Sequence, residues 1–268
     1  MGLVPDRSRK ILSARNANFP WALRRFAVCD LDLYPELGQP GRGVLVVTHI
    51  ANITAWRDGK NADGSTAAWS GDDKTVFKDM WCRIVSDMWS EQHRITTGTA
   101  NAMSGIVDIG VIFDLKISEA MAAADHSHVN LEVTKVEFGQ PKGAASNTGN
   151  VVNIGVKGCS LRGIVGGGPV WNDSARLRYI DIFPGNDLGG TAVAHEFGHM
   201  LGYRDEYPSA PWQRNDAWTG DTESIMYAGR IVRERHYTLF AAWLDAQYRR
   251  RGPLWKVNGR TDITNAGI

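Results

Sequence analysis

The chain has 268 residues, of which 43% are hydrophobic and 22% are charged, and its formal net charge is +1. Such a balance argues against a nucleic-acid binder that works by neutralising phosphates, and no apolar run approaches the roughly 20 residues of a membrane span. We therefore expect a globular protein with a sizeable core, no nucleic-acid partner and no membrane-spanning segment.

Cysteine usage and the N-terminal sequence bear on where the protein works. The chain has three scattered cysteines, Cys29, Cys82 and Cys159, which do not make a disulfide framework and fit synthesis in a reducing compartment. Residues 1–21 lack the apolar core of a secretory signal. We expect a protein that is cytoplasmic as synthesised, or that is exported by a route without a cleaved signal.

Two parts are expected along the chain. Residues 1–42 are punctuated by four prolines and show no regular pattern, so we expect an irregular extension wrapped on a domain that spans residues 43–268. That domain begins with an apolar, β-branched run at residues 43–54, which predicts a central strand. Apolar residues then recur at helical spacing over residues 76–89 and predict one long helix packed on the sheet.

The middle of the chain predicts further strands at residues 106–117, 129–138, 151–165 and 177–183. Residues 141–150 are typical of a turn-rich loop, and the three glycines at 166–168 of a flexible connection. His126 and His128 have the spacing of two ligands on one strand face, which would suit a second metal site. Because no third ligand has matching spacing, we favour exposed loop histidines.

The most informative stretch reads TAVAHEFGHMLGYRDE. His195 and His199 are four residues apart, so on a helix they lie on one face and can offer two imidazoles to one metal ion. Glu196 can reach a metal-bound water without being a ligand. Gly202 can end the helix in the left-handed conformation and bring Asp205 back toward the metal. Two nitrogens, one carboxylate oxygen and a position open to water are the ligand set of a catalytic zinc ion.

The sequence around this motif predicts its surroundings. Thr191 is the expected N-cap of the helix. Residues 207–223 read as a loop that contains Trp212 and Trp218, and the tetrapeptide Ser-Ile-Met-Tyr with Met226 as its third residue comes next. Residues 237–248 carry apolar side chains on one face and predict a closing helix.

The motif and the tetrapeptide together resemble the metzincin clan of zinc peptidases, in which a Met-turn runs beneath the metal. The resemblance is to the minority type with aspartate as the third ligand, as in snapalysin-like enzymes. It implies an α+β fold with a twisted mixed sheet, a long backing helix, an active-site helix, a Met-turn and a C-terminal helix. It covers about residues 43–250, although only residues 195–227 carry specific motifs.

The resemblance also implies roles for individual residues. One Zn²⁺ would be held by His195, His199 and Asp205, with Glu196 as the general base and Met226 as a hydrophobic floor. In the astacin and serralysin branches a metal-binding tyrosine lies two residues after the methionine, where this chain has alanine. Tyr227, directly after Met226, is therefore left as a candidate for packing or for contact with substrate or oxyanion.

We expect a zinc endopeptidase that acts on a peptide or protein substrate. The alternatives are a zinc hydrolase of another amide, such as a peptidoglycan cross-link or an effector target, and a non-catalytic zinc-stabilised binding module. Glu223 is an alternative third ligand, although Gly202 and Met226 favour Asp205. The tryptophans of the loop, Trp212 and Trp218, are expected to wall a specificity pocket or to anchor the loop.

Two further expectations concern access to the metal. The strand at residues 151–165 is expected to be an edge strand that pairs with substrate backbone. Cys29 or Asp30 can be interpreted as a pro-segment-like group that masks the zinc, but we favour a cysteine buried in a short strand at residues 26–33.

Overall fold

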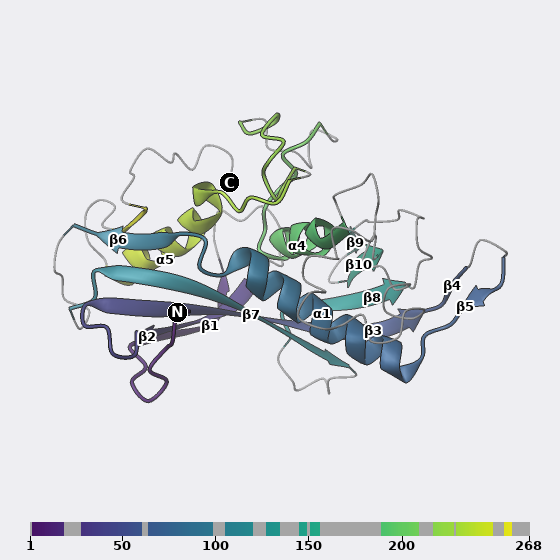
Figure 1. Cartoon of the computed structure of the whole chain (residues 1–268), viewed down its shortest axis with the longest axis horizontal. Coiled ribbons are helices and arrows are strands. Elements are labelled where there is room, and N and C mark those ends of the chain that lie inside the picture. Colours follow the sequence, from purple (N-terminus) through teal and green to yellow (C-terminus); the bar gives the residue numbers. More distant parts are fainter. Residues whose placement is uncertain are drawn as a thin grey trace.

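The computed structural model describes residues 2–18, 28–60, 64–98, 105–119, 127–134, 145–148, 151–155, 189–208, 217–227, 229–248 and 255–258. The strand expected at residues 177–183, the three glycines at 166–168, His126, Cys159 and Trp212 lie outside these ranges. The described residues form a mixed α/β fold in which helices pack on a curled mixed sheet (Figure 1). None of the helices in this part of the chain combines the length and apolarity that a membrane crossing requires.

The elements in chain order are β1 (Leu12–Asn18), β2 (Val28–Pro35), β3 (Arg42–Arg57), β4 (Gly59–Lys60), β5 (Thr66–Ala67), α1 (Gly71–Trp89), β6 (Arg94–Thr97), β7 (Asp108–Glu119), β8 (Val129–Thr134), β9 (Ala145–Thr148), β10 (Val151–Gly155), α4 (Gly189–Met200), the 3-10 helix η1 (Glu234–Tyr237), α5 (Thr238–Tyr248) and β11 (Trp255–Val257). Seven strands of the main sheet follow the order β11-β6-β7-β3-β8-β10-β9, and β2 and β1 join it through β3. Strands β4 and β5 form a separate two-stranded hairpin.

Strand β3 is the centre of the sheet, as its apolar sequence predicts. It pairs in parallel with β7 along one edge, and its other edge is shared by antiparallel β2 and parallel β8. Leu45, Val47 and Ala51 face the large core that includes the helices, whereas Val44 and Val46 belong to a small cluster on the opposite face. Because both faces are covered, apolar residues occupy successive positions instead of alternating with polar ones.

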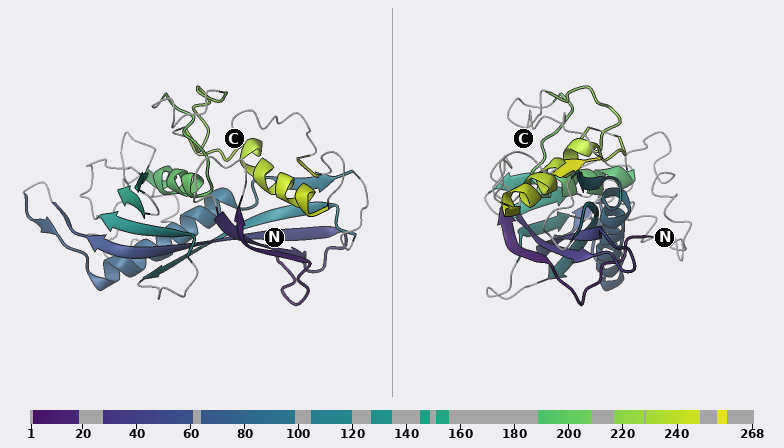
Figure 2. Two further views of the ribbon diagram at one scale, coloured as in Figure 1. Left: turned by 180° about the vertical axis from the view of Figure 1, so that it is seen from behind. Right: turned by 90° about the vertical axis from the view of Figure 1, so that its left-hand side faces the viewer.

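Helices α1, α4 and α5 share the larger core of the described sheet. Helix α1 begins with a capping box between Ser70 and Asp73 and buries Trp81 and Trp89 against the sheet. Helices α4 and α5 contribute to the same core, and both views in Figure 2 show them on the same side of the main sheet. The indole Nε1 of Trp89 donates a hydrogen bond of 2.9 Å to the carbonyl of Ala194, which fixes α4 to α1.

The N-terminal residues differ from the expected irregular extension. Strands β1 and β2 pair with each other and with β3, so they are part of the main sheet. The prolines do not interrupt them, because Pro35 ends β2 and Pro5 lies before β1. Cys29 is fully buried in β2, as the favoured interpretation holds, and burial raises the pKa of its thiol. Asp30 pairs with Arg15 and contacts His128.

The prediction of an exposed loop is wrong for His128, which is buried at the junction of β2 and β8. The pairing of β2 with β3 stops at Thr48 and that of β8 starts at Ala51, which leaves the backbone of Ile50 between them. His128 fills this gap: its ring Nδ1 accepts from the Ile50 N–H at 2.8 Å, and its backbone N–H donates to the Ile50 carbonyl at 2.8 Å. Buried backbone groups need hydrogen-bond partners, and the His128 ring is buried here because it supplies one to the Ile50 N–H.

Three smaller expectations are also corrected. Residues 145–148 form β9 within the expected turn-rich loop, since this short polar segment gains its order by pairing with β10. Strand β10 lies between β8 and β9, so it is not an edge strand in the described sheet. Thr191 lies inside α4, which begins at Gly189, and is therefore not its N-cap. Glycine has a low helix propensity, so the two glycines before Thr191 led to a predicted helix start that is too late.

Candidate metal centre

Helix α4 places the two motif histidines side by side. Its apolar face, with Ala194 and Phe197, is buried in the core, and Phe197 packs edge-on against Trp89. His195 and His199 are one turn apart on the face away from this contact, with ring centroids 4.7 Å apart and ring planes nearly perpendicular. The helix therefore fixes both imidazoles through packing of the opposite face.

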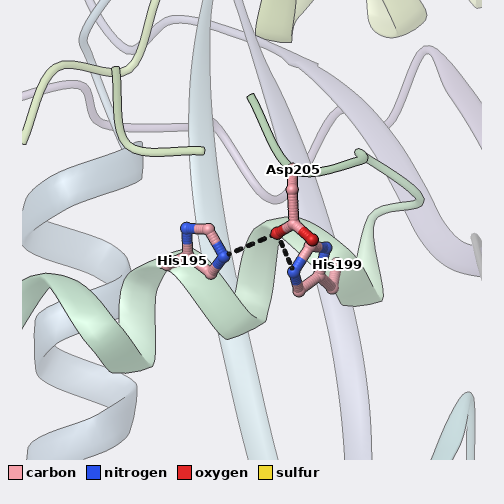
Figure 3. A group of neighbouring side chains, drawn as sticks. All are labelled: His195, His199 and Asp205. Atoms are coloured by element: carbon pink, nitrogen blue, oxygen red, sulfur yellow. Dashed lines mark hydrogen bonds and ion pairs between the residues drawn. The ribbon is translucent and has the colours of Figure 1, made fainter. Parts of the chain in front are cut away.

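The chain reverses after α4 as the sequence predicts. Gly202 has a φ of +96°, and its N–H donates to the His199 carbonyl at 3.0 Å. The next N–H, of Tyr203, reaches the Gly198 carbonyl at 3.1 Å, which completes a Schellman-type helix end. The turn brings the buried carboxylate of Asp205 over the helix. Its Oδ1 lies 3.2 Å from Nε2 of His195 and 3.0 Å from Nε2 of His199 (Figure 3).

Both histidine tautomers are set by backbone carbonyls. Nδ1 of His195 lies 2.8 Å from the Ile225 carbonyl, and Nδ1 of His199 lies 2.8 Å from the Tyr203 carbonyl. A carbonyl can only accept, so each Nδ1 carries a proton, and in the neutral tautomer each Nε2 offers its lone pair to a metal ion. Partners of this kind orient the histidine ligands of metal sites.

In this arrangement three electron-pair donors converge on one point. Ligand atoms of His195, His199 and Asp205 all lie within 4.8 Å of one another. Two lone pairs and a carboxylate oxygen repel one another unless a proton or a metal cation lies among them. Tetrahedral ligands at about 2.1 Å from zinc are about 3.4 Å apart, close to the observed separations. The donor set therefore fits a small divalent cation.

The electrostatics of Asp205 agree with a cation-binding role. Burial by itself raises the pKa of this carboxyl group, but its close contacts with the His195 and His199 rings outweigh burial and hold the pKa well below its usual range. Asp205 is therefore a carboxylate at neutral pH. Glu223, the alternative third ligand, has an exposed side chain that pairs with Arg233. The histidines thus meet Asp205 and not Glu223.

Met226 lies beneath α4 and is fully buried. The segment that contains Met226 is tied to the site at two points, because the Ile225 carbonyl contacts His195 and the Met226 carbonyl accepts from the Glu206 N–H at 2.8 Å. A Cβ added at Gly198 would lie 2.3 Å from the Met226 sulfur and 3.1 Å from Trp89. Sequence reasoning missed this role of Gly198, although a glycine inside an otherwise good helix was a signal for it.

We expect Gly198→Ala to destabilise the protein. Alanine favours the helix by up to about 1 kcal/mol, whereas overpacking costs roughly 1–3 kcal/mol, so the net change should be a loss. Thermal unfolding of the metal-free protein measures it. Gly71→Ala is the matched control, because a Cβ at this first residue of α1 meets nothing within 4 Å. Equal melting temperatures for Gly198→Ala and wild type would show that the close approach is not tight.

Aromatic side chains flank the His195 side of the site. The Tyr207 ring stacks on the His195 ring with centroids 6.0 Å apart, and Tyr227 packs edge-on against Tyr207. The contact of Tyr207 with His195 was not predicted from the sequence, since nothing in the spacing of Tyr207 indicates it. Trp218 is half-buried, and the Arg235 guanidinium lies 4.5 Å from the centre of its ring. Glu196 lies in α4 next to His195, as the motif requires.

Glu206, which follows Asp205, is a second buried carboxylate. Burial raises the pKa of this group, but hydrogen bonds from Arg235 and His236 outweigh burial and lower its pKa from 4.5 to about 2. A carboxyl group whose pKa is lower in the folded state stabilises the fold at pH values above its unfolded pKa. This stabilisation is lost as the pH falls toward its folded pKa. The shift corresponds to a contribution on the order of 3 kcal/mol.

The free energy of unfolding of the metal-free protein should therefore exceed that of Glu206→Gln above about pH 5, and the difference should shrink as the pH falls through about 4 toward 2. Urea unfolding of both proteins across this pH range measures the difference. A gap that stays constant with pH would mean that the Glu206 charge does not contribute.

Comparison with protein-family models, with curated proteins and with solved structures gives no match for this chain.

Proposed function

We propose that the chain is a zinc-dependent endopeptidase of the metzincin type with aspartate as third ligand. The observation that carries the proposal is the convergence of two Nε2 lone pairs and the Asp205 carboxylate, with each Nδ1 proton held by a carbonyl. The H-E-x-x-H-x-x-G-x-x-D motif, the buried Met226 under α4 and the closing helix α5 support it.

His195, His199 and Asp205 would hold the ion. When bound, zinc lowers the pKa of a coordinated water and polarises the carbonyl of the scissile bond. Glu196 would take the proton of the attacking water and deliver it to the leaving amine. Tyr207 and Tyr227 flank the His195 side of the centre and would meet substrate there.

Reconstitution with metal tests the proposal. Purified protein should bind about one zinc ion per chain, cleave an unfolded protein substrate, lose both properties with a chelator and regain both when zinc is restored. His199→Ala, which removes one proposed ligand, should bind zinc far more weakly and show no cleavage. Cleavage that persists after complete removal of metal would contradict the proposal.

A further inference from the structure

Glu206 is adjacent to the ligand Asp205, but its side chain binds a different set of partners. Nε of Arg235 donates to its Oε1 at 2.7 Å, and an Arg235 terminal nitrogen donates to its Oε2 at 2.5 Å. Nε2 of His236 lies 3.4 Å from Oε1. The other nitrogen of His236 accepts from the Arg233 N–H at 3.0 Å, so Nε2 carries the proton and donates. Glu206 as a whole residue is 3% exposed.

The partners of Glu206 are themselves fixed. Arg235 also donates to Asp221 at 2.6 Å, and its guanidinium stacks over Trp218. Asp221 accepts two hydrogen bonds from Arg233, at 3.0 and 2.7 Å. A fork-to-fork pair between arginine and carboxylate fixes orientation as well as distance. The orientation of residue 206 is thus set by groups in the loop before the Met-turn and in the segment around η1.

The backbone of Glu206 is held as well. Its N–H donates to the Met226 carbonyl at 2.8 Å, and its carbonyl accepts from the Gly220 N–H at 3.4 Å. Asp205 therefore lies between two fixed points, the helix end at Gly202 on one side and the anchored Glu206 on the other. A buried ion pair is a weak source of stability compared with apolar packing, but it is strongly directional.

We propose that Glu206, through Arg235, is a positioning residue that presets the Asp205 carboxylate at the two histidine nitrogens before metal arrives. The inference rests on the proposed metal site and gives Glu206 a role in holding one of its ligands. A ligand that is already held in place loses less conformational freedom when metal binds, so a fixed Asp205 carboxylate raises metal affinity. Removal of partners that orient metal ligands typically lowers metal affinity about 10-fold to 100-fold.

A double-mutant cycle on zinc affinity tests the inference without any activity assay. Competition with a chromogenic chelator gives the zinc affinity of wild type, Glu206→Gln, Asp205→Ala and the double variant. Glu206→Gln keeps the shape of the side chain and should weaken zinc binding about 10-fold. In the Asp205→Ala background the same change should have almost no effect, because the group that Glu206 positions is gone.

The controls separate positioning from general stability. Asp32→Asn removes another largely buried carboxylate that pairs with Lys10 and Arg15, and it should leave zinc affinity unchanged. Arg235→Lys retains the charge but not the planar fork, and it should weaken zinc binding in the same direction as Glu206→Gln. It also provides the test if Glu206→Gln does not fold.

Each remaining outcome decides the question. An equal loss of affinity with and without Asp205 would overturn the positioning role, and so would no loss in Glu206→Gln when Asp205→Ala weakens binding. Unchanged zinc affinity in Asp205→Ala itself would overturn the proposed metal site, and the inference with it.

Discussion

Replacement of Glu196 by glutamine is expected to lower kcat/KM for peptide cleavage by on the order of 100-fold or more while zinc content stays at about one ion per chain. Glutamine retains the size of the side chain but cannot take a proton from water, and the three proposed ligands, His195, His199 and Asp205, are unchanged. Zinc analysis and steady-state kinetics on the same preparation measure both quantities.

Glu223→Gln is the matched control for this experiment. It removes a carboxylate that is exposed and pairs with Arg233, so it should retain both zinc and activity. The same variant tests whether Glu223 is the third ligand, since a ligand change would lower zinc affinity. A Glu196→Gln protein that cleaves at the wild-type rate would remove Glu196 from the mechanism.

Met226→Ala is expected to destabilise the protein by roughly 2–5 kcal/mol through lost burial and the cavity left behind. Met226 is fully buried and lies directly under Gly198 in α4. The effect should be on stability and not on the chemical step, because the Met226 sulfur packs against Gly198 of α4. Thermal melts of the zinc-loaded and metal-free variant measure it.

The contact of Met226 with Gly198 provides an internal control. If Gly198→Ala is costly because its Cβ meets the Met226 sulfur, the same change should cost less in the Met226→Ala background. Met88→Ala truncates a methionine that is only partly buried at the edge of the core, and it should cost less than Met226→Ala. An unchanged melting temperature in Met226→Ala would mean that the segment is not packed under the helix.

Local patterns in the sequence predict several elements of the structure. The apolar run of β3 and the helical spacing of α1 each follow from periodicity within one segment. The convergence of His195, His199 and Asp205 is predictable for the same reason, because an i, i+4 pair and a glycine helix end are both local features.

The features that sequence reasoning missed depend on distant partners. His128 is buried because β2 and β8 leave a gap on the same edge of β3, which no local pattern records. Strand β9 carries little strand signal of its own and is ordered by its neighbour. Glu206 and Arg235 are 29 residues apart, so their pairing follows from the fold alone.

Zinc held by His195, His199 and Asp205 is proposed to support hydrolysis of peptide bonds. Incubation of the zinc-loaded protein with a peptide library in ¹⁸O-labelled water tests this proposal, with new termini read by mass spectrometry. We expect new carboxyl termini that carry one ¹⁸O, and none from chelated protein or from Glu196→Gln. Zinc-loaded protein that leaves every peptide intact, or cleavage that is equal in all three samples, would show that this site does not hydrolyse peptide bonds.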